Sequence, residues 1–312
     1  MFRGFLLRDM EFGKVATSDL GRIDHHLPGD APSTATVLAK SASAGPVSYY
    51  VGCAKWGREE WKGLIYPEDT KVADFLDAYA KLFNAIELNA SFYKVPTDSS
   101  VAGWRNKVEV NAINGFTFVP KFPKSISHFK KLKNAEEMTE RFIRSVEGLG
   151  EHLGPCFLQL SDAFAPKDFD VLKAYLEYLP AHLDVYVELR NASWFSDMTA
   201  REQVYSLFSS RNIGWVITDT SGRRDLLHME LTRPEAFIRF EGNGKAMLAA
   251  DEKRIADWVR RIKAWNKQGL QKVYFFLHQA DEADTPALAS ITIERMNNEL
   301  QAGLIPIQFV SK

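Results

Sequence analysis

The sequence predicts an α/β protein with the TIM-barrel (β/α)8 fold, preceded by an irregular N-terminal extension. Two observations carry this prediction. From Ser48 onward, short runs rich in β-branched and aromatic residues alternate with longer stretches of helical periodicity, which is typical of βα units around a parallel sheet. Eight such runs fit into about 265 residues, close to the usual size of a TIM barrel.

The first 47 residues read as an extension, because their composition disfavours regular structure. Pro28-Gly29-Asp30, the segment from Ala31 to Thr36 and the segment from Ser41 to Pro46 are rich in residues that interrupt helices and strands. We therefore divide the chain into an extension over 1–47 and a barrel domain over 48–312. Met10 offers an alternative start to the chain.

The eight predicted strands follow in order, each a short apolar run between turn signals. They cover residues 48–53, 85–91, 117–122, 156–160, 184–190, 214–219, 236–240 and 272–278. Between them, residues 72–83 and 254–265 show apolar side chains at three- and four-residue spacing, which predicts helices. A doubly wound sheet is the alternative fold. It is disfavoured because the loop after the first strand reads Gly52-Cys53-Ala54-Lys55, with no Gly-rich nucleotide-cofactor motif.

Composition excludes several classes of protein. The chain has 39 basic and 40 acidic residues, so no long-range field would hold it on nucleic acid or an anionic membrane. No run approaches the roughly 18 apolar residues of a membrane helix. The segment from Met1 to Asp9 lacks the apolar region and cleavage site of a signal peptide, so we expect a cytoplasmic protein with no membrane partner. Cys53 and Cys156 lie in separate apolar stretches and are expected to be buried thiols.

Polar side chains stand near the C-terminal ends of the predicted strands, where TIM-barrel enzymes carry out their chemistry. In the second strand Glu87 and Asn89 oppose an apolar face, and in the fifth Glu188 and Arg190 do the same. Strand alternation then directs the apolar residues to the helices and the polar residues to the barrel interior. The same reasoning places Lys121, Gln159, Asp219, Arg239 and His278 in the interior. Seven strands thus contribute to a predicted polar site.

The charged residues of this site suggest alternative roles, and spacing alone does not choose among them. The cations can hold an anionic group of a substrate, and Glu87 or Glu188 can act as general acid or base. The three carboxylates can instead share an oxygen-ligated divalent metal ion, or the charges can neutralise one another and close the barrel top. The cations are Lys121, Arg190 and Arg239, and the carboxylates are Glu87, Glu188 and Asp219.

Histidines and aromatic residues add further candidates. His278 ends the last strand and suits either a catalytic or a structural role, and His128 is a weaker candidate. No His-Glu-x-x-His motif occurs, so a dedicated zinc site is unsupported. Aromatic residues in the predicted top loops can stack on a sugar or a nucleobase, or can pack as loop cores. They are Trp56, Trp61, Tyr66 and Trp194.

A lysine-rich stretch supports a nucleic-acid alternative. Lys121, Lys124, Lys130, Lys131 and Lys133 are interleaved with two phenylalanines and can grip phosphates. The acidic residues Glu136, Glu137 and Glu140 follow at once, which favours a solvated surface at a helix start.

Four motifs in order resemble the YecE-like family, the domain of unknown function 72. They are Val51-Gly52-Cys53 through Tyr66-Pro67, Glu87-Leu88-Asn89-Ala90-Ser91-Phe92-Tyr93, Leu153-Gly154-Pro155 before Leu158-Gln159-Leu160, and Glu188-Leu189-Arg190-Asn191-Ala192-Ser193-Trp194. The resemblance covers nearly everything from Tyr49 to Ala289 and implies a TIM barrel likened to sugar isomerases, with no established reaction. It also implies a cavity lined by Glu87, Asn89, Tyr93, Gln159, Glu188, Arg190, Trp194 and Asp219. The chain departs from the family at Ala54-Lys55 and after His278, and it carries its own N-terminal arm.

These observations lead to three hypotheses about function. The first is an enzyme that uses acid-base chemistry on a small anionic or carbohydrate-like substrate, of the isomerase or epimerase type. Its expected catalytic residues are Glu87, Glu188, Asp219 and His278, and its expected binding residues are Trp61, Asn89, Tyr93, Lys121, Gln159, Arg190, Trp194 and Arg239. The second is a nucleic-acid-binding protein or metal-dependent phosphodiesterase, and the third is a non-catalytic metabolite-binding barrel. A glycosidase would require Glu87 and Glu188 to be about 5 to 5.5 Å or roughly 6.5 to 9.5 Å apart.

Overall fold

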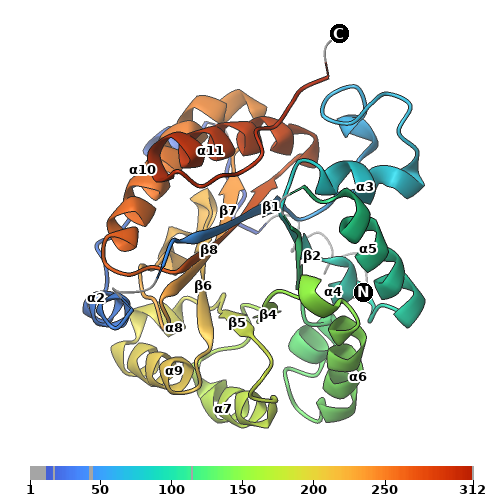
Figure 1. Ribbon diagram of the computed structural model, residues 1–312. Coiled ribbons are helices and arrows are strands. Elements are labelled where there is room, and N and C mark those ends of the chain that lie inside the picture. The colour runs from blue at the N-terminus through green and yellow to red at the C-terminus, as the bar shows by residue number, and fades with distance from the viewer. Residues whose placement is uncertain (1–11, 17, 42–44, 114, 311–312) are drawn as a thin grey trace.

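The computed structural model describes residues 12–16, 18–41, 45–113 and 115–310. Met1 to Glu11, which include the alternative start at Met10, lie outside the described residues. From residue 48 onward the chain forms the predicted TIM barrel, with strands at the centre and helices around them (Figure 1).

Eight parallel strands form the barrel wall in the order β3-β2-β1-β8-β7-β6-β5-β4. The strands are β1 (Ser48–Cys53), β2 (Ala85–Leu88), β3 (Thr117–Pro120), β4 (Cys156–Gln159), β5 (Val185–Glu188), β6 (Gly214–Asp219), β7 (Glu235–Gly242) and β8 (Lys272–Gln279). Parallel bridges of Phe118 with Leu153 and of Lys121 with Phe157 join β3 to the chain around β4, which nearly closes the barrel.

Helices cover the outside of the wall and pack between successive strands (Figure 1). The longer ones are α3 (Phe75–Ala80), α5 (Asp98–Asn111), α6 (Glu136–Glu147), α7 (Phe169–Tyr178), α9 (Met198–Ser210), α10 (Leu248–Asn266) and α11 (Thr285–Leu300). Two four-residue helices lie shortly after strand ends, α4 (Ala90–Tyr93) after β2 and α8 (Ser193–Ser196) after β5.

Four strands end earlier than the sequence predicted: β2 ends at Leu88, β3 at Pro120, β4 at Gln159 and β5 at Glu188. After Leu88 the chain turns into α4, and the Ser91 hydroxyl donates to the Leu88 carbonyl at 2.7 Å. The predicted helix over 72–83 is also shorter, since Val72–Asp74 forms a separate 3-10 turn before α3. The predicted helix over 254–265 lies within the longer α10.

Apolar residues form two layers on opposite sides of the wall, as strand alternation requires. Between wall and helices lies the main core, which includes Val185 and Val187 of β5. Inside the barrel a second cluster fills the lower part. It comprises Ala85, Val119, Phe157, Tyr186, Val216, Phe237, Tyr274 and Phe276. The polar residues of the barrel interior lie above this apolar cluster, toward the C-terminal ends of the strands.

The expectation that residues 31–36 lack regular structure is wrong, because α2 (Pro32–Ala39) forms there. Proline is well suited to the first position of a helix, where its fixed φ is already helical and no N–H is needed. Thr34 anchors α2 on the barrel: its hydroxyl donates to the Met229 carbonyl at 2.8 Å and accepts from the Leu231 N–H at 3.0 Å. Within the described residues, no helix combines the length and apolar character needed to cross a membrane.

Candidate functional site

A pocket of about 310 Å³ opens at the C-terminal ends of the strands. The loops and strand ends that line it come from nearly every side of the barrel. Its lining comprises Phe12, Ala54, Lys55, Asn89, Phe92, Tyr93, Lys121, Gln159, Arg190, Thr218, Arg239, Glu241, His278, Gln279, Ala280 and Glu282. Seven of the twelve residues predicted for the site line the pocket: Asn89, Tyr93, Lys121, Gln159, Arg190, Arg239 and His278. Two more, Glu87 and Glu188, are bonded to Arg239 beneath it.

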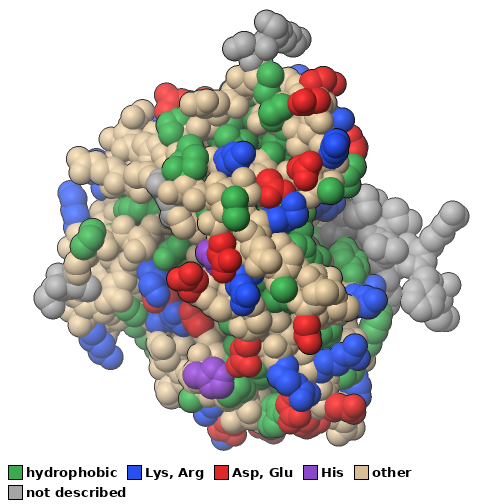
Figure 2. Space-filling view, turned by 45° about the vertical axis from the view of Figure 1, so that its right-hand side comes forward, with side chains coloured by type: hydrophobic (Ala, Val, Ile, Leu, Met, Phe, Trp, Pro, Cys, Tyr) green, Lys and Arg blue, Asp and Glu red, His purple; other side chains and the backbone are tan. Residues whose placement is uncertain are grey.

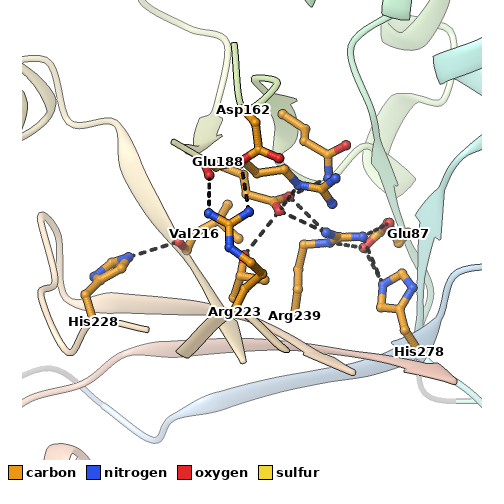
Figure 3. A network of polar contacts seen from close by, with 11 residues as sticks. Glu87, Asp162, Glu188, Val216, Arg223, His228, Arg239 and His278 are labelled. Atoms are coloured by element: carbon orange, nitrogen blue, oxygen red, sulfur yellow. Dashed lines mark hydrogen bonds and ion pairs between the residues drawn. The ribbon is translucent and has the colours of Figure 1, made fainter. Parts of the chain in front are cut away.

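A buried Glu–Arg–Glu triad forms the floor of this pocket (Figure 3). Arg239 on β7 donates through Nε and Nη2 to the two Glu87 oxygens at 2.8 and 3.0 Å. Its Nη1 donates to both Glu188 oxygens at 3.1 and 2.9 Å. The planar guanidinium can bind two carboxylates in this way because its donors form a rigid fork. Glu87 and Glu188 are fully buried by this arrangement.

Other side chains complete the hydrogen bonding of each carboxylate. On Glu188, Gln159 donates at 2.7 Å and the Arg190 Nε donates at 2.9 Å. The Asn89 amide donates to Glu87 at 2.9 Å. His278 Nε2 lies 3.0 Å from a Glu87 oxygen and 3.2 Å from Arg239 Nη2. A proton on Nε2 donated to Glu87 would leave Nδ1 as the basic nitrogen of a neutral imidazole.

These contacts decide the ionisation of the two glutamates. Burial by itself would raise the Glu188 pKa, but Arg239, Arg190 and Lys121 outweigh it and lower that pKa to about 2. Burial likewise opposes the charge on Glu87, and Arg239 and His278 hold the Glu87 pKa well below its usual range. Both groups are permanent anions at neutral pH, so neither is suited to act as general acid.

The glycosidase arrangement considered from the sequence does not fit this geometry. A glycosidase needs open space between its two carboxyl groups for the glycosidic bond and, in inverting enzymes, for a water molecule. Here the Arg239 guanidinium lies between Glu87 and Glu188 and is bonded to both. This geometry therefore does not support a glycosidase mechanism that uses Glu87 and Glu188 as its two carboxyl groups.

Asp219 was predicted to face the site, and the structure places it on the opposite side of the wall. In β6, Val216 and Thr218 face the interior, so Asp219 faces the helix layer. Arg254 and Trp258 of α10 donate to its carboxylate at 2.8 and 2.6 Å, and Arg224 forms a further ion pair with it. Burial opposes the charge, but Arg254 and Arg224 lower the Asp219 pKa. Asp219 thus ties α10 to β6.

The proposed sharing of a divalent metal ion by three carboxylates also fails on geometry. Glu87 and Glu188 use their oxygens on Arg239, and Asp219 points the other way. Among the described residues, three His or acidic side chains bring ligand atoms within 4.8 Å of one another at Glu109, Glu151 and His152. None of those three lines the pocket.

Trp61 and Trp194 were predicted to bind substrate, and both are instead fully buried loop cores. The Trp61 indole N–H donates to the Glu282 carbonyl at 2.9 Å, and the Trp194 indole N–H donates to the Phe164 carbonyl at 2.8 Å. Tyr66 is buried beside Trp61 and donates to the Trp56 carbonyl at 3.0 Å. An indole in a top loop packs this way because burial of its large ring is favourable once the N–H has a partner.

The lysine-rich stretch divides into one buried and several exposed residues. Lys121 lies in the pocket, whereas Lys130, Lys131 and Lys133 are exposed. On the face shown in Figure 2, basic and acidic side chains are interspersed. His128 is buried against the Phe92 ring and does not line the pocket.

Sequence reasoning missed nine of the lining residues, and three of these bear on the chemistry or shape of the pocket: Thr218, Glu241 and Phe12. Glu241 and Thr218 were detectable, because Glu241 continues the inward alternation of Phe237 and Arg239, and Thr218 continues that of Val216. Ending the seventh strand at residue 240 hid Glu241, since β7 runs to Gly242. Burial raises the Glu241 pKa, although His278 and Thr220 act against it. Glu241 is therefore a better candidate for a proton-carrying carboxyl group than either glutamate of the triad.

The last of these three residues is Phe12, which comes from the N-terminal arm. Its ring lies 3.7 Å from the Arg190 guanidinium carbon at the pocket wall. Next to it, the Gly13 carbonyl accepts from the Gly222 N–H at 2.8 Å and from the Thr220 hydroxyl at 3.0 Å. Gly13 has φ +76°, and a Cβ there would lie 1.9 Å from the Thr220 hydroxyl oxygen, so only glycine allows this approach. No local sequence signal indicates that the arm reaches this position.

Comparison with known proteins places most of the chain in one family. The family model described as "Protein of unknown function DUF72" matches residues 50–307. The UPF0759 protein YecE of Escherichia coli is 25% identical over 276 residues, which cover 82% of this chain and 96% of that protein. The UPF0759 protein YunF of Bacillus subtilis is 22% identical over 288 residues, or 83% of this chain and 98% of that protein.

Solved structures agree in fold. A DUF72 family protein from Thermotoga maritima superposes with a TM-score of 0.65 at 24% identity, covering 81% of this chain and 100% of the other. A DUF72 family protein from Enterococcus faecalis gives a TM-score of 0.65 at 19% identity, covering 80% of this chain and 95% of the other. The motifs, the barrel and the family match together show that this chain belongs to the DUF72 family of uncharacterised TIM-barrel proteins.

Proposed function

We propose that the pocket binds a small anionic, carbohydrate-like molecule and catalyses a proton-transfer reaction of the isomerase or epimerase type on it. The observation that carries this proposal is the composition of the pocket wall. Lys121 and Arg190 supply positive charge, Asn89, Gln159 and Thr218 supply neutral polar groups, and His278 and Glu241 supply titratable groups. Such a set suits a ligand with one anionic group and several hydroxyls.

The triad has a supporting role in this proposal. Arg239 directs its donors to Glu87 and Glu188, so it contributes a fixed charge distribution to the floor. Glu87 also accepts from His278 and orients its ring. Proton transfer then falls to groups that reach the pocket, namely His278 and Glu241. A low-dielectric floor of fixed charges can stabilise charge that develops in a transition state without reorganising.

The test is a thermal-shift screen of the purified protein against sugar phosphates, sugar acids, organic acids and divalent metal ions. A ligand at 100 times its Kd stabilises the folded state by about 2.7 kcal/mol. With an unfolding entropy of roughly 2.1 cal/mol/K per residue, this raises the midpoint by about 4 °C. We expect a hit among the phosphates or acids that is lost in Arg190→Ala and retained in Arg22→Ala, whose side chain is 84% exposed.

Turnover is then assayed with the ligand found in the screen, by following exchange of carbon-bound hydrogen with deuterium in heavy water. Loss of exchange in His278→Gln or Glu241→Gln, with binding retained, supports the enzyme. Binding without exchange in the wild type identifies a metabolite-binding barrel instead. The absence of any hit among anionic or sugar-like ligands overturns the proposal.

A second candidate, nucleic-acid binding, draws on one specific observation. Tyr93 and Phe129 are 59% and 57% exposed, and the Lys124 ammonium lies over both rings at 5.1 and 5.8 Å from their centroids. Exposed rings beside a cation can stack on nucleobases. Short single- and double-stranded oligonucleotides are therefore added to the screen. Salt-sensitive binding that disappears in Lys130→Glu/Lys131→Glu and persists in Arg190→Ala would favour this candidate.

A further inference from the structure

Lys121 is held in a fixed position with its amine inside the pocket. It follows β3, and Ser91 contacts its backbone on both sides: the Ser91 hydroxyl shares its proton between the Leu88 and Lys121 carbonyls, at 2.7 and 2.8 Å, and accepts from the Lys121 N–H at 3.0 Å. A bridge with Phe157 fixes its register. The side chain is only 6% exposed, and Nζ lies 4.1 Å from the Phe92 ring centroid and 5.4 Å from that of Phe157.

The charge of this amine is compensated only at long range. In the part of the chain that the structure describes, no carboxylate oxygen lies within 4.0 Å of Lys121 Nζ. The two nearby anions, Glu87 and Glu188, are bonded to Arg239. A buried ammonium near two guanidinium groups is therefore poorly stabilised.

The free amine is accordingly well populated at neutral pH. Burial, and then the positive charge of Arg239, lower the Lys121 pKa to about 7, while Glu87 and Glu188 act in the opposite direction. Only the unprotonated form of lysine is a nucleophile, and desolvation beside other cations is a recognised way to obtain it at neutral pH. A lysine that only bound an anion would need its positive charge, and an environment that lowers its pKa would weaken that binding. The environment of Lys121 therefore favours a role for the nitrogen lone pair.

We propose that Lys121 is a nucleophile that forms an imine with the carbonyl carbon of an aldehyde or ketone carrying an anionic group. This inference rests on the proposed function, because it names the substrate class of the same pocket. Open-chain sugar phosphates and keto acids belong to this class. Arg190, which lines the same pocket, is placed to receive the anionic group, and Lys121 receives the carbonyl.

The step balances without an oxidant or reductant. The Nζ lone pair forms a bond to the carbonyl carbon, the carbonyl electron pair moves to oxygen, and oxygen takes a proton to give a carbinolamine. Nitrogen loses one proton in the same stage, which restores its lone pair. A second proton then reaches the oxygen, the C–O bond breaks, water leaves, and the nitrogen lone pair forms the C=N bond of a protonated imine. Loss of the last nitrogen proton gives the neutral imine. The sum is amine plus carbonyl gives imine plus water.

Two pocket residues can handle these protons. His278 and Glu241 line the same cavity as Lys121. They lie opposite each other on the neighbouring strands β8 and β7. A protonated imine also withdraws electrons from the adjacent carbon and acidifies its hydrogen. This property connects an imine to the proton-transfer chemistry of an isomerase or epimerase.

The experiment uses reductive trapping with two carbonyl probes, pyruvate and pyridoxal 5′-phosphate. The full-length protein is incubated with each probe, reduced with sodium borohydride, digested and analysed by peptide mass spectrometry. We expect one label per chain at Lys121, formed at least ten times faster than at the exposed pocket lysine Lys55. Its rate should rise with pH through a midpoint near 7, the value to which burial lowers the Lys121 pKa. Labelling of Lys55 and surface lysines with Lys121 unlabelled overturns the inference.

Two variants and one competitor separate this inference from the proposed function. Lys121→Arg keeps the charge and should abolish the fast label, whereas Lys130→Arg at an exposed position should retain it. Glycerol 3-phosphate, an anionic polyol without a carbonyl, should raise the thermal midpoint and slow the labelling. A thermal shift without labelling of Lys121 overturns the nucleophile and retains the anion site. Labelling that glycerol 3-phosphate does not affect supports the nucleophile and counts against the anionic substrate class.

Discussion

The buried triad makes Arg239 the most consequential single residue of the pocket floor for stability. Arg239→Met removes the guanidinium and keeps an unbranched apolar side chain in place of the arginine stem. Glu87 and Glu188, both 0% exposed, would each lose two charge-assisted hydrogen bonds. Removal of one partner of a buried ion pair typically costs about 3 to 5 kcal/mol. An unfolding entropy of roughly 2.1 cal/mol/K per residue over 312 residues is about 0.65 kcal/mol/K, so the midpoint should fall by about 5 to 8 °C.

The pH dependence gives this prediction a sign as well as a size. In the wild type the Glu188 pKa is lowered from 4.5 to about 2, so its stabilising contribution is fully present above pH 4.5 and is lost as pH falls from 4.5 to 2. Without Arg239, burial dominates and raises the pKa of both carboxyl groups. Protonation of Glu87 and Glu188 then removes the uncompensated buried charges of the variant. The difference in stability between variant and wild type should therefore shrink as pH falls from 7 to 4.

The assay is thermal unfolding of both proteins at a fixed scan rate between pH 4 and pH 8. Arg22→Met is the matched control, because its side chain is 84% exposed and its loss should change stability by no more than about 0.5 kcal/mol. Adding Glu188→Gln to Arg239→Met should recover part of the loss, although Glu188→Gln alone is destabilising. A loss below about 1 kcal/mol that does not vary with pH would refute the reasoning.

Three further outcomes follow from the same structure. Phe12→Ala should weaken binding of the anionic ligand about two- to five-fold, because it removes a cation–π contact with Arg190 worth roughly 0.5 to 1 kcal/mol. The affinity is obtained from the thermal unfolding midpoint as a function of ligand concentration, and equal affinity would show that the arm does not shape the pocket. Burial lowers the His228 pKa from 6.5 to about 3, so the free energy of unfolding should decline as pH falls from 6.5 toward 3. Denaturant titrations of His228→Phe should show a smaller decline, and the same dependence on pH as in the wild type would contradict this. Cys53 and Cys156 are 0% exposed and burial raises the pKa of both thiols, so a thiol reagent should find neither in the folded protein and both after unfolding; reaction in the folded state would contradict the packing.

Strand alternation predicted much of the candidate site, and it failed where a charged residue had a partner elsewhere. It placed Glu87, Lys121, Gln159, Glu188, Arg239 and His278 toward the barrel interior, as the structure does. It misplaced Asp219, because a buried carboxylate can also face the helices when Arg254 and Trp258 are there to receive it. That partnership joins residues 35 and 39 positions apart, and no local pattern reveals it.

Residue type also misled the interpretation of the loops. Trp61 and Trp194 lie after strand ends, as expected of binding residues, yet each finds a carbonyl for its N–H and is buried. In the extension, Pro32 was read as a helix breaker, although at the first position of α2 it favours the helix. In each case the sequence limits which structures are possible, and the surrounding packing chooses among them.

By itself, the sequence determined the barrel, the layer of polar residues above its apolar floor and the family to which the chain belongs, since these depend on periodicity and on motifs that can be read along the chain. Only the tertiary structure decided which charges are bound to one another. It fixed Glu87 and Glu188 on Arg239, brought Phe12 to the pocket and, among the residues that the structure describes, left no carboxylate within 4.0 Å of the Lys121 amine. The physical reason is range: secondary structure follows from neighbours a few residues apart, whereas the ionisation and reactivity of a buried group depend on charges within a few ångströms in space.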